Sequence, residues 1–122
     1  MQATEFLVTN IRGVTVVGFQ SQSILDSVEV ETIGQRLYRL VDEQAQRKIV
    51  LDFGQVRLLS SQMLGVLINL HKKAEKINGA LILCGLRPEL GKVFKITRLD
   101  KLLKFAKDEE AALNEFGVSG RT

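Results

Sequence analysis

The stretch of sequence that decides the fold is DFGQVRLLSSQMLG, residues 52–65. An apolar run over residues 49–51 leads into it and stops at Asp52, and a short loop then brings two serines to the start of an amphipathic helix. A strand is therefore followed directly by a helix. The first turn of a helix presents unpaired backbone N–H groups that favour negative charge. A hydroxyl at this point either caps the helix or carries a phosphate.

Length and composition indicate one ordinary globular domain. The chain has 122 residues, of which 45% are hydrophobic and 25% are charged. No apolar stretch approaches the roughly 20 residues that span a bilayer, and the first five residues lack the features of a signal peptide. The single cysteine, Cys84, excludes an internal disulfide and favours a reducing compartment. We therefore expect a cytoplasmic protein that does not associate with a membrane.

Positive charge is concentrated in the second half of the chain. Residues 63–122 carry eleven basic and seven acidic side chains, against six and seven in residues 1–62. Basic residues recur at short intervals from Arg87 to Lys107. They form either a surface for an anionic partner or simply a solvated face. The few aromatic residues do not alternate with the lysines as they do on a base-stacking surface, so we expect no direct nucleic-acid binding.

The spacing of apolar residues predicts alternating strands and helices. We expect strands over residues 5–9, 14–19, 48–53, 80–84 and 102–105, helices over residues 26–46, 61–77, 88–97 and 108–116, and a loop over residues 20–25. The order predicts an α/β fold in which an N-terminal hairpin joins a mixed, mostly parallel sheet with about four helices. Residues 1–116 are expected to form the domain, and residues 117–122 a flexible C-terminal tail.

Residue types that carry catalysis are scarce. His71 is the only histidine and is expected on the surface of a helix, while Cys84 is expected to be an inert thiol in a buried strand. One histidine and one cysteine cannot build a zinc site. The glycines are scattered rather than gathered into a phosphate-binding loop, and Asp26, Asp52 and Asp100 suggest no carboxylate pair. We therefore expect no cofactor, no metal site and no enzymatic activity.

The order of features around the two serines resembles the STAS domain, the family of anti-sigma factor antagonists (anti-anti-sigma factors) and their relatives. An acidic residue and a glycine follow a strand, and a hydrophobic pair precedes two hydroxyl residues and a Leu-Gly pair. The similarity continues over residues 67–74, 78–83 and 88–103, which covers most of the chain. The resemblance implies a single-domain STAS-like fold. It also implies a non-catalytic regulator that binds an anti-sigma factor of the serine kinase type.

The same resemblance assigns roles to individual residues. The family's phosphorylated serine falls on Ser61. Ser60 occupies the position usually held by an aspartate, Gln62 replaces a second hydroxyl residue, and Met63 replaces a glycine. The resemblance therefore implies Ser61 as the phosphorylation site, and Ser60, Gln62, Met63 and Leu64 as partner-binding residues. Met63 is expected to place a flexible apolar side chain near the contact surface.

Phosphorylation of Ser61 is expected to act on binding rather than on folding. A phosphoserine adds about two negative charges, which the start of a helix tolerates. A partner packed against Met63 and Leu64 would have to remove water from that charge or neutralise it.

Three alternatives stay open at this point. The serines only cap the helix, the chain is a constitutive interaction or scaffold module that is never phosphorylated, or residues 87–107 bind nucleic acid. The sequence does not distinguish a monomer from a weak dimer.

Overall fold

The structure is a computed structural model that describes residues 6–118. Its elements in chain order are β1 (Phe6–Ile11), β2 (Val14–Phe19), β3 (Ser23–Ile24), α1 (Ser27–Asp42), β4 (Lys48–Asp52), β5 (Leu58–Leu59), α2 (Ser61–Lys76), β6 (Ala80–Cys84), α3 (Pro88–Ile96), β7 (Lys104–Ala106) and α4 (Glu109–Glu115). The expected α/β order, with an opening hairpin and four helices in the described range, is confirmed.

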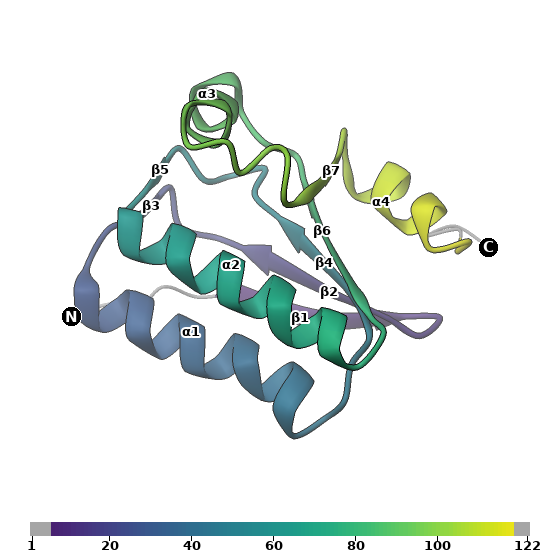
Figure 1. The fold of residues 1–122 in the computed structure, drawn as a ribbon. Coiled ribbons are helices and arrows are strands. Elements are labelled where there is room, and N and C mark those ends of the chain that lie inside the picture. The colour runs from purple at the N-terminus through teal and green to yellow at the C-terminus, as the bar shows by residue number, and fades with distance from the viewer. Residues whose placement is uncertain (1–5, 119–122) are drawn as a thin grey trace.

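Five strands form the main sheet in the order β1-β2-β4-β6-β7. Only β1 runs antiparallel to its neighbour, and the other pairs are parallel. Val17 lies beside Leu51, which lies beside Leu83, so large aliphatic side chains line up across the central strands. Each parallel pair needs a crossover, and α1, α2 and α3 provide the three crossovers (Figure 1).

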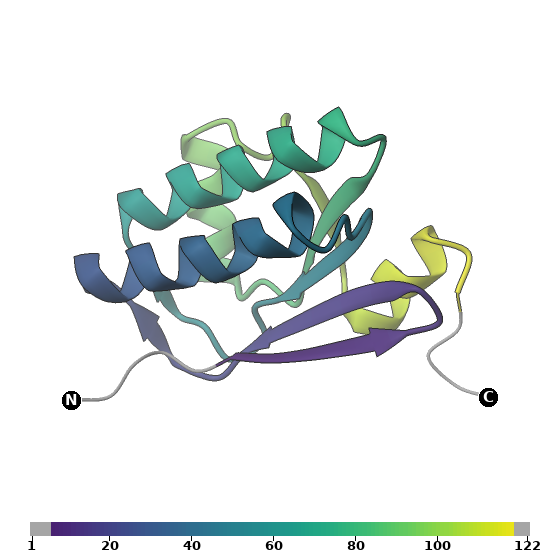
Figure 2. The same cartoon turned by 90° about the horizontal axis from the view of Figure 1, so that it is seen from below.

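The helices divide between the two faces of this sheet (Figure 2). Helices α1, α2 and α3 cover one face, over the larger hydrophobic core. Helix α4 covers the other face, where Ala112 and Leu113 pack on Val50, Ile82 and Cys84. A parallel sheet that is covered by helices on both faces has no solvated side. The central strands are therefore apolar on both sides. No helix within residues 6–118 combines the length and the apolarity that crossing a membrane requires.

The loop expected over residues 20–25 contains the short strand β3, which pairs in parallel with β5. Ser23 lies beside Leu58 and Ile24 beside Leu59, and the N–H of Ser60 donates to the carbonyl of Ile24 at 3.0 Å. Two-residue strands carry no readable alternation, so the sequence pattern could not reveal them. The pairing holds the segment before α1 against the segment before α2.

Element boundaries also differ from expectation, most clearly at the end of α1 and at the start of β7. Helix α1 stops at Asp42 rather than near residue 46, because Ala45 adopts a left-handed φ of 52° that no helix continues. Strand β7 begins at Lys104 rather than at residue 102. The left-handed Arg98, at φ 63°, follows α3, and the N–H groups of Leu102 and Leu103 turn back to the carbonyl of Leu99.

The chain does not become irregular at residue 117. Gly117, at φ 75°, closes α4, and the N–H of Val118 donates to the carbonyl of Leu113 at 3.0 Å. This is the Schellman arrangement that commonly ends a helix. Val118 packs against the smaller core on the α4 side of the sheet. The rest of the expected tail, residues 119–122, lies outside the described residues.

Candidate functional site at the start of helix α2

Ser60 is the cap of helix α2. Its backbone is extended, with φ −80° and ψ 160°, and its Oγ accepts the N–H of Met63 at 3.1 Å. The Ser60 carbonyl accepts the first helical bond, from the N–H of Leu64. A serine in this geometry satisfies one of the orphan donors of the first turn. The capping role is therefore taken by the first of the two serines.

Ser61 is the first helical residue of α2, and its side chain is exposed. Within the part of the chain that the structure describes, its hydroxyl makes no hydrogen bond. The first turn of α2 contains no acidic residue, whereas the first turns of α1, α3 and α4 each contain at least one. The positive end of the α2 dipole is thus left without a compensating negative side chain. The exposed hydroxyl of Ser61 is the group at this position to which a negative charge can be attached.

Met63 does not lie near a contact surface, and that expectation was wrong. Its side chain is 0% exposed and belongs to the larger core. Position 63 begins the apolar stripe that continues through Val66, Leu67 and Leu70, so its side chain points toward the sheet. Leu64 is partly buried and packs against the same core. A partner cannot reach Met63 unless the helix moves.

Exposed aliphatic side chains stand near Ser61 instead. Leu25 follows β3, Val28 lies in the first turn of α1, and Leu58 begins β5; they are 51%, 64% and 53% exposed. The starts of α1 and α2 and the β3–β5 pair gather at one end of the molecule (Figure 1). The Nε2 of Gln62 lies 3.4 Å from the carbonyl oxygen of Ser27, to which it donates across the two helix starts.

We call this end of the molecule the helix-start surface. Its members are exposed or partly exposed side chains around the beginning of α2: Leu25, Val28, Leu58, Ser61, Gln62 and Gly65. Gly65 lies one helical turn beyond Ser61, and a Cβ added to it would meet nothing within 4 Å. Sequence reasoning missed the three aliphatic residues. In the sequence, each of the three is a single apolar residue outside the apolar face of a predicted helix or within a predicted loop. Such residues are common on any protein surface, so they do not mark a site.

The aspartate of the opening motif has a structural role. Asp52 Oδ1 accepts the N–H of Gly54 at 2.8 Å, which ends β4 and starts the loop toward the serines. Its carboxylate is also close enough to Glu109 on α4 to raise the pKa of that side chain. The sequence did not indicate this pair, because Asp52 and Glu109 are far apart in sequence and only the fold brings them together.

The Asp52–Glu109 pair changes the chemistry of its neighbours. Burial, the hydrogen bond to Asp52 and the charge of Asp52 raise the pKa of Glu109 above its ordinary value of 4.5. Burial first, and then the nearby carboxylates, raise the pKa of Cys84 to about 12. The thiol is thus protonated at neutral pH and fully buried, which confirms the expected position of Cys84 in a buried strand.

His71 and the basic residues from Arg87 to Lys107 lie outside the helix-start surface. His71 is less exposed than expected, at 14% of its side chain, and its Nε2 is 3.5 Å from Glu75 Oε2. Most of the basic side chains from Arg87 to Lys107 are exposed around α3 and β7. Across residues 6–118, no three His, Cys, Asp or Glu side chains are grouped as a metal site would require.

Comparison with known proteins agrees with this architecture. Residues 5–112 match the family model of the STAS domain. BtrV of Bordetella bronchiseptica, assigned as an anti-sigma factor antagonist, is 32% identical over 95 residues, which cover 78% of this chain and 81% of BtrV.

Solved structures show the same fold. The chain is similar to an anti-sigma factor antagonist from Mycobacterium paratuberculosis, with a TM-score of 0.81 and 25% identity over 93% of each chain. It is also similar to the phosphorylated form of the Bacillus cell fate determinant SpoIIAA, with a TM-score of 0.71 and 23% identity over 92% of this chain and 99% of that one. The chain therefore belongs to the STAS domain family, in which its relatives include anti-sigma factor antagonists.

Proposed function

We propose that this protein is an anti-sigma factor antagonist that binds a kinase-type anti-sigma factor through the helix-start surface and is switched by phosphorylation of Ser61. The observation that carries the proposal is the division of roles between the two serines. Ser60 Oγ is engaged as the cap of α2, while the exposed hydroxyl of Ser61 has no partner among the described residues. The relatives support the same role, because BtrV is assigned as an anti-sigma factor antagonist and SpoIIAA exists in a phosphorylated form.

The docking surface in this proposal is aliphatic. Leu25, Val28 and Leu58 together expose apolar area beside Ser61, and Gln62 adds a polar group. Apolar side chains exposed together beside one polar site are typical of a surface that a protein partner covers. Leu64 contributes through its exposed part and Ser60 by fixing the first turn. Met63 acts from the core, where it holds the helix on the sheet.

In this proposal, a phosphate on Ser61 leaves the fold intact and weakens binding of the partner. At the start of a 16-residue helix whose first turn has no acidic side chain, added negative charge meets the favourable end of the dipole. Within residues 52–65 the only basic side chain is Arg57, so the surface itself offers little to neutralise a phosphate. A partner that covers the aliphatic side chains would have to dehydrate that charge, which is costly.

Phosphate mapping tests the site. The full chain is incubated with ATP and a kinase-type anti-sigma factor from the same organism, and the product is analysed by intact mass and peptide fragmentation. We expect one phosphate, on Ser61, that is lost in Ser61→Ala and retained in Ser60→Ala. A phosphate on another residue, or an unmodified chain at full kinase activity toward a control substrate, would contradict the proposal.

A further inference from the structure

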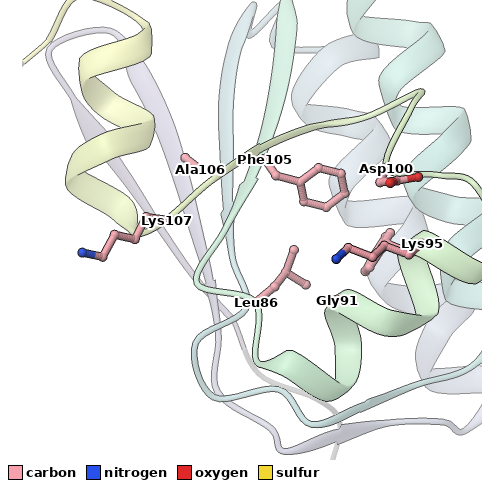
Figure 3. Close-up of a pocket in the computed structure, with 8 residues that line it drawn as sticks. Leu86, Gly91, Lys95, Asp100, Phe105, Ala106 and Lys107 are labelled. Carbon is pink, nitrogen blue, oxygen red and sulfur yellow. The ribbon is translucent and has the colours of Figure 1, made fainter.

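A surface pocket lies between α3 and the strand β7 (Figure 3). Its volume is about 430 Å³, and its lining includes Leu86, Gly91, Phe94, Lys95, Asp100 and Phe105. Pockets that hold small molecules usually measure about 300–1,000 Å³. None of the lining residues belongs to the helix-start surface, so the pocket is independent of the proposed function.

The floor of the pocket is aromatic and fixed. The rings of Phe94 and Phe105 meet edge to face, with centroids 5.3 Å apart and an interplanar angle of 71°. Phe94 is 1% exposed and anchored in the core, and Leu86 packs beside it. Because these side chains are held by their neighbours, the apolar floor is preformed and needs little ordering when a ligand binds.

The rim of the pocket carries charge of both signs, with one cation directed inward. The ammonium group of Lys95 points toward the space between Leu86 and Phe105, whereas Lys107 points away from it (Figure 3). Lys95 makes no salt bridge within residues 6–118. The carboxylate of Asp100 stands at the edge beside Phe105 (Figure 3). An unpaired cation above an aromatic floor attracts a single negative charge, while the nearby carboxylate repels a second one.

The electrostatic surroundings favour an anion as well. Residues 87–107 contain seven basic and two acidic side chains, which leaves ten basic and twelve acidic side chains for the rest of the chain. The net charge is therefore +5 in this segment and −2 elsewhere. Charge of one sign around a concave site raises the local concentration of ligands of the opposite sign.

We propose that this pocket binds a small amphipathic monoanion, with an aromatic or branched aliphatic body on Leu86 and Phe105, which Phe94 supports from below, and a carboxylate or sulfonate paired with Lys95. Asp100 disfavours dianions such as phosphate monoesters. Gly91 provides access, because it lies on α3 at the pocket wall and a Cβ added to it would meet nothing within 4 Å.

Two fluorescent probes test the site in the full folded chain. 1-Anilinonaphthalene-8-sulfonate carries an aromatic body and one negative charge, and N-phenyl-1-naphthylamine is its uncharged counterpart. We expect saturable binding of both probes at one site. Lys95→Met should lower the affinity for the anionic probe about fivefold, as expected for the loss of a partly exposed ion pair. The affinity for the neutral probe should stay unchanged. Equal loss of both probes would overturn the assignment of Lys95.

Filling the pocket provides the second arm of the test. Gly91→Leu adds a side chain at the pocket wall, where its Cβ meets no neighbouring atom within 4 Å, and it favours the helix. The melting temperature should therefore not fall, while both probes lose saturable binding. Gly65→Leu is the matched control, since it makes the same exchange at an equally open helical glycine on α2 and should keep both probes. Full binding by Gly91→Leu, or amide shifts in the NMR spectrum that map to the helix-start surface, would overturn the proposal.

Discussion

The helix-start surface and the α3–β7 pocket both expose apolar atoms beside an open helical glycine, yet they suit different ligands. Around Ser61 the exposed aliphatic side chains surround a hydroxyl, with no acidic residue in the helical turn. In the pocket the apolar atoms form a concave aromatic floor below the ammonium of Lys95. We propose that the first surface suits a protein partner whose binding weakens when negative charge is added. The second suits a molecule that brings its own negative charge.

Shortening Met63 should produce the largest effect on stability. Because its side chain is 0% exposed in the larger core, we expect Met63→Ala to lower the free energy of unfolding by about 2–5 kcal/mol. Denaturant unfolding measures this change. Val28→Ala, at a side chain that is 64% exposed, is the control and should change stability little. Similar losses in the two variants would mean that Met63 is not a core residue.

Bulk added at Gly65 should block the helix-start surface and leave the pocket alone. We expect Gly65→Arg to weaken binding of the anti-sigma factor about tenfold or more, because the new side chain projects one turn from Ser61 into the space a partner needs. Gly91→Arg is the matched control and should keep the affinity. Calorimetric titration of both variants gives the comparison, and an unchanged affinity for Gly65→Arg would place the partner elsewhere.

The cap at Ser60 should contribute to stability but not to phosphate transfer. Ser60→Ala removes the hydroxyl that accepts the Met63 N–H, so we expect a loss of about 1 kcal/mol in the free energy of unfolding. Ser61→Ala should lose much less, because its hydroxyl makes no hydrogen bond among the described residues. Thermal unfolding of the two variants distinguishes them, and a larger loss for Ser61→Ala would reverse the assigned roles.

The carboxylate pair on the other face of the sheet should change stability with pH and leave both surfaces unaffected. The folded state raises the pKa of Glu109 above 4.5, so it binds that proton more tightly than the unfolded chain does. The contribution of Glu109 to the free energy of unfolding is therefore fully present below about pH 4.5, and it is lost as the pH rises through the raised pKa. Glu109→Gln should flatten this slope and raise stability slightly at neutral pH.

Unfolding measured from pH 4.5 to 7.5 checks this effect, with the exposed Glu110→Gln as the control. A slope that survives in Glu109→Gln would assign it to other groups. A change in partner or probe binding would show that the two faces of the sheet are coupled.

Most of the fold could be predicted because its elements leave local signals. The unbroken apolar centres of β4 and β6, the three- and four-residue spacing in α2 and the left-handed Asn78 after it were all readable in sequence. The β3–β5 pair could not be predicted, because two-residue strands have no period. The Asp52–Glu109 contact could not either, since only the fold brings the two residues together.

The site was only partly readable for the same physical reason. A serine pair before a helix indicates a cap, but the cap position depends on which residue keeps an extended backbone, and that is settled by the β3–β5 pairing just before it. Met63 fitted both the apolar stripe and the imagined contact surface, and only its packing against the sheet distinguishes the two. The aliphatic residues Leu25 and Val28 lie beside the serines only because the fold brings the two helix starts together.

The most direct test of the central proposal is the affinity of the anti-sigma factor for three forms of the full chain: unmodified, Ser61→Ala and Ser61→Asp. We predict nearly equal dissociation constants for the first two, and one about 100-fold weaker for Ser61→Asp, because a carboxylate at this position must lose water under the partner. Equal affinity for all three forms would contradict the account and indicate a constitutive interaction module.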